Sequence, residues 1–103
     1  MEKMYNKAIR DKIPEIIRKS GDQCEVKKIS DVEFLIALEK KLHEELTEYE
    51  ETKSVDELVD LLEVIYRIAE LRGFYQEEIS LKRKQKNDER GSFSKNLFLI
   101  KTS

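Results

Sequence analysis

Five acidic residues in the middle of the chain stand at spacings that suit metal-ion chemistry. Glu44, Glu45 and Glu48 form one group, and Glu57 and Asp60 form another. Side chains three or four residues apart lie on one face of a helix, so each group would present its carboxylates together. Carboxylate oxygens suit a hard cation such as Mg²⁺ or Mn²⁺, and the neighbouring sequence lacks the pair of Cys or His side chains that zinc prefers.

Glu45 is the most unusual of these acids because it falls in an apolar face. On a wheel of the helix expected over residues 31–51, with Glu44 at zero, Glu45 lies at roughly 100°, between Phe34 and Leu38. A carboxylate in an apolar stripe is costly unless a cation or strong donors meet it. The wheel therefore indicates that Glu45 needs a partner. His43 falls on the polar side of the same helix, where we expect it to be a bystander.

The second expected helix, from Ser54 to about Arg72, shows a weaker form of the same anomaly. Its main apolar arc contains Ile68, Leu61, Ile65, Leu58, Ala69, Leu62 and Val55. Glu57 lies at one edge of that arc, and Asp60 lies roughly 60° beyond Glu57. Two apolar residues, Val64 and Leu71, fall between these acids in angle, so this side is not a plain solvated face.

Packing of the two helices through these stripes would bring Glu45 and its neighbour Glu48 close to Glu57 and Asp60. Carboxylates that converge in a partly buried site repel one another and raise their own pKa values, unless a divalent cation neutralises them. Metal sites in helix bundles are built in this way, from acids on facing helices. The wheels therefore predict a metal site between the helices.

Each acid also has an ordinary explanation. Such spacings can arise by chance in a helical protein rich in glutamate. Glu57 follows Ser54 by three residues, which matches a capping box and would be a purely structural role. Lys41 precedes Glu45 by one helical turn, and an exposed ion pair between them would contribute well under ~1 kcal/mol. These alternatives stay open at the level of sequence.

Local signals place the acids on long helices. The expected helices are a short one opened by Pro14 and closed at Gly21, one over 31–51, one to about Arg72 and one over 75–90. The connection at 52–54 is so short that the second and third helices must be antiparallel neighbours. Residues 24–29 alternate roughly in polarity, which predicts a short strand. The apolar residues 97–100 predict either a terminal strand paired with 24–29 or a packed tail.

Composition sets limits on the class of protein. The chain has 103 residues, 20 Lys and Arg against 22 Asp and Glu, 3 Gly, 1 Pro and 1 Cys. This size predicts a single domain over 1–103, and few Gly and Pro favour an all-α fold over an all-β one. A formal charge of −2 argues against stable binding to nucleic acid or a membrane. The lone Cys24 and the absence of a long apolar run predict a soluble, cytoplasmic protein.

The acidic groups and both ends of the chain resemble one known family. Glu44-Glu45-Leu46-Thr47-Glu48 followed by Glu57-Leu58-Val59-Asp60 resembles the EExxE…ExxD signature of the MazG-like nucleoside triphosphate pyrophosphohydrolases. The segments 5–14, YNKAIRDKIP, and 89–93, ERGSF, resemble the small phosphoribosyl-ATP pyrophosphohydrolase-like branch, so the likeness covers nearly the whole chain. Only eight residues separate Glu48 from Glu57, which is shorter than the usual spacing of the family and implies a tight hairpin.

The resemblance implies a fold, a reaction and a set of site residues. The fold is an all-α antiparallel bundle completed as a homodimer or a dimer of dimers. The reaction is Mg²⁺-dependent hydrolysis of a nucleoside triphosphate to the monophosphate and pyrophosphate. By resemblance, the metal ligands are Glu45, Glu48, Glu57 and Asp60, and Glu44 is a carboxylate that either supports the ligands from outside or activates water. The substrate would be a (d)NTP, with phosphoribosyl-ATP as the alternative.

Such a substrate also needs cationic partners for its phosphates. One candidate cluster lies at near-helical spacing in the last expected helix and comprises Arg83, Lys86, Asn87 and Arg90. A second lies near the N-terminus and comprises Lys7, Arg10 and Lys12. An ordinary solvated face is the alternative for each cluster. A noncatalytic helical dimerisation or adaptor module is the competing function.

Overall fold

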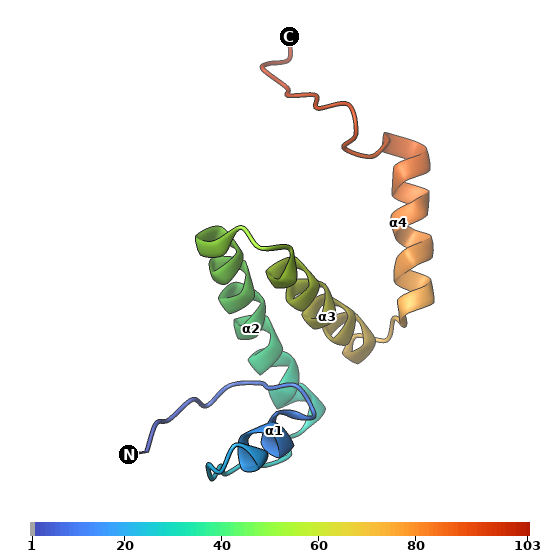
Figure 1. Cartoon of the computed structure of the whole chain (residues 1–103). Helices are drawn as coiled ribbons and strands as arrows, with labels where there is room; N and C mark the ends of the chain where they lie inside the picture. The colour runs from blue at the N-terminus through green and yellow to red at the C-terminus, as the bar shows by residue number, and fades with distance from the viewer. Residues whose placement is uncertain (1) are drawn as a thin grey trace.

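The computed structural model describes residues 2–103, and over these residues the chain is all-α with no strand. The helices are α1 (Ile13–Lys19), α2 (Asp31–Thr52), α3 (Val55–Leu71) and α4 (Gln76–Arg90), as Figure 1 shows. The all-α prediction is therefore confirmed, and each helix begins and ends within two residues of its expected bounds.

The hairpin between α2 and α3 is set by local capping. The hydroxyl of Ser30 accepts a hydrogen bond from the backbone N–H of Glu33, which starts α2. Lys53 takes a left-handed conformation with φ of 57°, and its N–H donates to the Tyr49 carbonyl at 2.7 Å, which ends α2. Ser54 then caps α3 through the N–H of Asp56. Because only two residues separate the helices, they lie antiparallel and side by side (Figure 1).

The core is small and lies between this hairpin and the N-terminal segment. Ala8, Leu38 and Val64 are buried together, and half-buried apolar side chains of α2 and α3 surround them. Ala8 reaches the core from residues 2–12, which precede α1. The N-terminal segment is therefore packed on the hairpin rather than free of it.

The face of α3 that packs against α2 differs from the one the wheel predicts. Val64, on the side between Glu57 and Asp60, is buried. By contrast, the main apolar arc is largely open, and its exposed residues are Val55, Leu58, Leu62 and Ile65, with Val59 beside them. The packed face therefore combines one edge of the predicted main arc, where Leu61 and Ile68 are half-buried, with the side that carries Val64, while the rest of the arc is open. We call Val55, Leu58, Val59, Leu62 and Ile65 the open stripe of α3.

The two expected strands are also not formed. Residues 24–29 run as an irregular connection between α1 and α2. Residues 97–100 extend beyond α4, with Leu97 at 87% exposure, and Figure 1 shows this end of the chain far from α1. A strand needs a partner for its backbone groups, and neither segment has the other within reach. The alternative of a packed tail is also wrong, because each of the four side chains of residues 97–100 is at least 79% exposed.

The chain is extended compared with a compact domain of its size. Its Cα radius of gyration is 18.0 Å, whereas a compact chain of this length would have about 13 Å. Its accessible surface is 9770 Å², whereas a folded monomer of this mass would expose about 6,000 Å². Part of the surplus comes from α4 and the C-terminal tail, since α4 contacts only α3 among the described helices, and α1 contacts none of the other three.

Among residues 2–103, no helix is both long enough and apolar enough to cross a lipid bilayer.

Candidate metal centre

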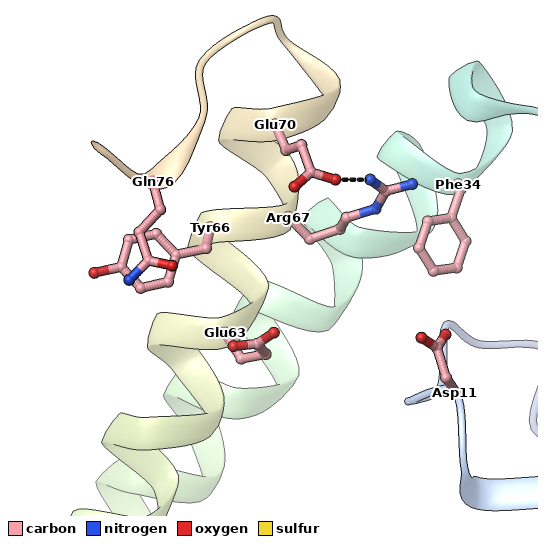
Figure 2. Close-up of a pocket in the computed structure, with 7 residues that line it drawn as sticks. All are labelled: Asp11, Phe34, Glu63, Tyr66, Arg67, Glu70 and Gln76. Atoms are coloured by element: carbon pink, nitrogen blue, oxygen red, sulfur yellow. Dashed lines mark hydrogen bonds and ion pairs between the residues drawn. The ribbon is translucent and has the colours of Figure 1, made fainter. Parts of the chain in front are cut away.

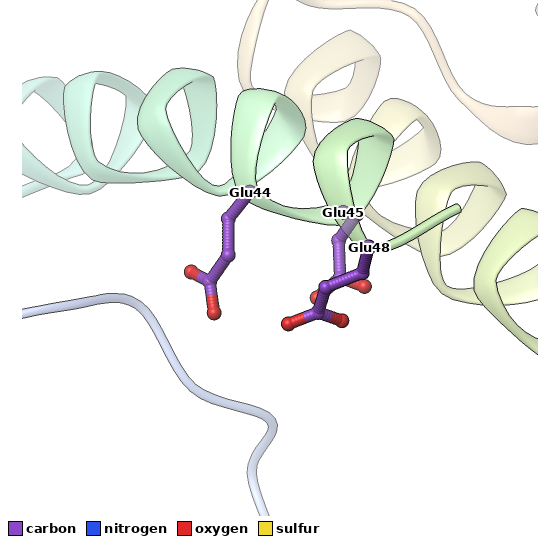
Figure 3. A group of neighbouring side chains, drawn as sticks. All are labelled: Glu44, Glu45 and Glu48. Carbon is purple, nitrogen blue, oxygen red and sulfur yellow. The ribbon is translucent and has the colours of Figure 1, made fainter. Parts of the chain in front are cut away.

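The hairpin brings all five predicted acids into one cluster. Carboxylate oxygens of Glu44, Glu45 and Glu48 lie within 4.8 Å of one another, and so do those of Glu45, Glu57 and Asp60. Figure 3 shows the three α2 carboxylates projecting from one side of the helix. Glu45 belongs to both groups and therefore lies at the centre of the cluster. The convergence follows from the antiparallel hairpin, whereas the roles of these residues as metal ligands stay predictions.

Glu45 combines deep burial with an incomplete set of partners. Its residue is 5% exposed, and Oε2 is buried without a hydrogen-bond partner. Lys41 Nζ lies 3.5 Å from the other oxygen, Oε1. The predicted ion pair therefore exists, but it lies below the surface and serves only one oxygen. Leaving a buried acceptor unsatisfied costs about 1–3 kcal/mol, and more for a charged group, so this oxygen is energetically costly unless a cation or a donor meets it.

Burial and repulsion act in the same direction on Glu45. Desolvation raises the pKa of its carboxyl above the ordinary value, and the charges of Glu48 and Asp60 raise it further, while Lys41 opposes them. Partial desolvation also raises the pKa of Glu57, and a hydrogen bond with Glu48 and repulsion from the Glu48 charge raise it further. A divalent cation in the cluster would relieve the repulsion that these shifts report.

The structural explanation for Glu57 fails. In a capping box its carboxylate would accept a hydrogen bond from the N–H of Ser54. Instead, that N–H donates to Thr52 Oγ1 at 3.2 Å, and the Ser54 hydroxyl caps the N–H of Asp56. The Glu57 side chain is therefore not engaged in capping and lies with the acidic cluster.

Two of the predicted phosphate-binding residues pair with the acids themselves. Lys7 Nζ lies 2.9 Å from Glu44 Oε1, and Arg10 Nη2 lies 2.7 Å from Asp60 Oδ1. The hydrogen bond to Glu44 raises the pKa of Lys7, against the effect of partial desolvation. Sequence reasoning missed this pairing. The available signal was the apolar pair Ala8-Ile9, which stands between the two cations Lys7 and Arg10.

The third predicted residue of that cluster is not at the acids. Lys12 lies at the start of α1 and is exposed. Within the described part of the chain it forms no ion pair within 4.0 Å. The structure therefore divides the N-terminal cluster into two residues at the acids and one away from them. His43 is exposed, as expected for a bystander.

The second predicted cluster lies apart from the acids. Its members line a hollow of about 310 Å³ at the C-terminal end of α4, together with Gly91 and Phe93, and they are Arg83, Lys86, Asn87 and Arg90. In Figure 1 this end of α4 points away from the α2–α3 hairpin. The structure thus gathers these four residues with one another but does not bring them to the acids of the same chain.

A further open hollow of about 500 Å³, shown in Figure 2, lies toward the other end of the hairpin. It is lined by Asp11, Phe34, Glu63, Tyr66, Arg67, Glu70 and Gln76. Its lining is mainly polar, and Arg67 and Glu70 are paired with each other. No residue predicted for the site lies in it, although Asp11 and Glu63 directly neighbour the Arg10–Asp60 pair in sequence or by one helical turn.

Comparison with protein-family models, curated proteins and solved structures finds no match to this chain. The resemblance to the MazG-like family therefore stays a prediction that rests on the residues quoted above.

Proposed function

We propose that this chain is a Mg²⁺-dependent nucleotide pyrophosphohydrolase. It would cleave a (d)NTP or a related nucleotide to the monophosphate and pyrophosphate with water as the nucleophile. The observation that carries the proposal is Glu45, whose unpartnered buried oxygen lies at the centre of a carboxylate cluster. A buried anion surrounded by other anions needs a cation, and among residues 2–103 Glu45 itself is paired only with Lys41.

The donor set fits a hard divalent cation. Glu45, Glu48, Glu57 and Asp60 would hold Mg²⁺, and Mn²⁺ would also suit this all-oxygen set. When bound, the ion would lower the pKa of a water molecule and neutralise charge on the departing pyrophosphate. The outer carboxylate of Glu44 would accept the proton of the attacking water. The burial of Glu45 would keep the ligand cluster fixed while the other acids face the substrate.

We also propose that the active form is a homodimer. The open stripe of α3 is an apolar face without a partner among residues 2–103, and the surplus exposed surface is larger than the about 1,600 Å² that a standard interface buries. Charge favours association as well. Residues 79–101 carry 7 basic and 2 acidic side chains, whereas residues 31–71 carry 4 basic and 13 acidic ones. A second copy would then place a basic α4 near the acids, where the same chain does not.

A nucleotide panel with pyrophosphate release as readout tests the reaction. With Mg²⁺ present, we expect turnover of at least one (d)NTP or of phosphoribosyl-ATP, and we expect Glu45→Gln to abolish it while leaving the helical CD spectrum intact. The matched control is Glu50→Gln, which removes an exposed carboxylate from the same helix. Absence of turnover on a broad panel would show that the proposal is wrong.

The open stripe also favours a second candidate, a noncatalytic dimerisation or adaptor module. Such a module gains nothing from Mg²⁺, and neutralising the acidic cluster should stabilise it with or without the ion. A melting curve with and without Mg²⁺ separates the two functions, because a ligand that binds only the native state raises the midpoint.

A further inference from the structure

The N-terminal segment passes beside the acidic cluster, and its buried residue Ala8 packs against the hairpin there. Ala8 is 5% exposed and packs with Leu38 and Val64. Lys7 and Arg10 flank it and reach Glu44 and Asp60, on opposite helices of the hairpin. Figure 3 shows the N-terminal chain passing below the carboxylates of α2. The segment thus holds two cations against the outer acids of the cluster.

Lys7 and Arg10 do not form ion pairs with the acids at the centre of the cluster. In the described chain, neither Glu48 nor Glu57 has an ion pair within 4.0 Å, and Glu45 Oε2 has no hydrogen-bond partner. A divalent ion would therefore bind between the two pairs, at the acids that neither cation reaches. Such an ion would weaken both pairs, because it would neutralise the cluster and repel the two nearby side-chain cations.

We infer that Lys7 and Arg10 are exchangeable counterions, which hold Glu44 and Asp60 in the metal-free chain and turn to the phosphate oxygens of the substrate when a divalent cation is bound. The phosphate half of this inference rests on the proposed function. Both side chains are long and partly exposed, at 36% and 53%, so they have room to turn. Ala8 keeps their backbone in place, so the exchange needs no movement of the segment. Arg10 suits a phosphate group because its guanidinium donates two parallel hydrogen bonds.

The first arm of the test measures Mg²⁺ affinity of the full chain without nucleotide, by calorimetry. Removing a competing positive charge should tighten Mg²⁺ binding roughly fivefold at moderate salt for Lys7→Gln and for Arg10→Gln. Lys7→Arg keeps the charge and should bind like the wild type. The matched control is Lys19→Gln, which removes a lysine from the exposed pair with Glu15 in α1 and should have no effect. Unchanged or weaker Mg²⁺ binding in both glutamine variants overturns the inference.

The second arm uses inorganic tripolyphosphate as the probe, with Mg²⁺ saturating. Here the same two variants should bind about tenfold more weakly, since each loses a charge-assisted phosphate contact. The effects on metal and on tripolyphosphate therefore have opposite signs, which a merely structural role of these residues would not produce. CD and melting curves check folding, and the two variants test the inference independently.

The outcomes separate this inference from the proposed function. Tripolyphosphate binding that is equally tight in the wild type and in the Lys7→Gln and Arg10→Gln variants overturns the exchange alone. Wild-type protein that binds Mg²⁺ but no tripolyphosphate overturns both the exchange and the pyrophosphohydrolase proposal.

Discussion

The α2–α3 hairpin and the α4 arm, residues 76–103, differ in how their functional side chains are positioned. In the hairpin, apolar packing against α3 and Ala8 fixes the rotation of α2, and this places Glu45 in the interior. In the arm, no residue is buried, and Phe93 is fully exposed. The acids are therefore positioned by the fold of one chain, while the basic residues of α4 are positioned only relative to one another.

This difference indicates which parts of the proposed site are complete. The acidic cluster and its two N-terminal cations are assembled by contacts within the chain. The cluster around Arg83 and Arg90 has an equally suitable chemistry but no contact with the acids. The α4 arm is basic and carries apolar residues, whereas the hairpin is acidic and has the open stripe. Such complementary surfaces are expected in a chain that forms a dimer with a second copy.

The largest expected effect is on that association. The double variant Leu58→Asp/Leu62→Asp places two charges on the open stripe of α3 and should weaken the dimer by at least about a hundredfold, because buried unpaired charges are so costly. Light scattering after gel filtration measures the mass in solution. Val32→Asp, at an exposed position at the start of α2, is the control and should leave the mass unchanged. A dimer that survives the double change would place its interface elsewhere.

The next effect compares the two regions directly. Leu38 is 6% exposed, so Leu38→Ala should destabilise the chain by about 2–4 kcal/mol through lost burial and a cavity. Leu81 in α4 is 57% exposed, and in an isolated chain Leu81→Ala should cost less than about 0.5 kcal/mol. Urea unfolding measures both. If Leu81→Ala costs as much as Leu38→Ala, Leu81 is buried in the assembly. The α4 arm would then pack against a second copy of the chain.

The sequence predicts those features of the fold that depend on local chemistry. Ser30, Ser54 and the glycines that follow the helices set the helix ends, because caps act within a few residues. The burial of Glu45 is also predictable, since it follows from the period of α2. The rotation of α3 is predictable only in part: Leu61 and Ile68 of the main arc are half-buried, whereas Leu58 and Leu62 of the same arc are exposed.

Two other features depend on contacts distant in sequence. The pairing of Lys7 and Arg10 with the acids follows from the path of an irregular segment, which has no period to read. The apolar residues 97–100 resemble a strand in composition, but strand formation depends on a partner that the single chain does not bring to them.

The smallest expected effect concerns the acids at the centre of the hairpin and depends on pH. The pKa of Glu45 and that of Glu57 are raised above 4.5 in the folded chain, so between 4.5 and the raised pKa the native state binds more protons than the unfolded chain. Metal-free stability from these groups is therefore fully present below pH 4.5 and is lost as pH rises through the raised pKa. Glu45→Gln removes the contribution of Glu45 to this loss, because its amide stays neutral.

Urea unfolding of the wild type and of Glu45→Gln from pH 4 to 8, in a chelator and then in Mg²⁺, measures this difference. Without the ion, the stability of the variant relative to the wild type should increase with pH and then level off above the raised pKa. Mg²⁺ should reduce or reverse that advantage, because the ionised wild-type carboxylate binds the ion and the amide does so poorly. The exposed Glu50→Gln should show neither trend. An advantage that is independent of both pH and Mg²⁺ would mean that Glu45 is only a buried polar residue, and the contrast between a functional hairpin and an incomplete arm would then lose its basis.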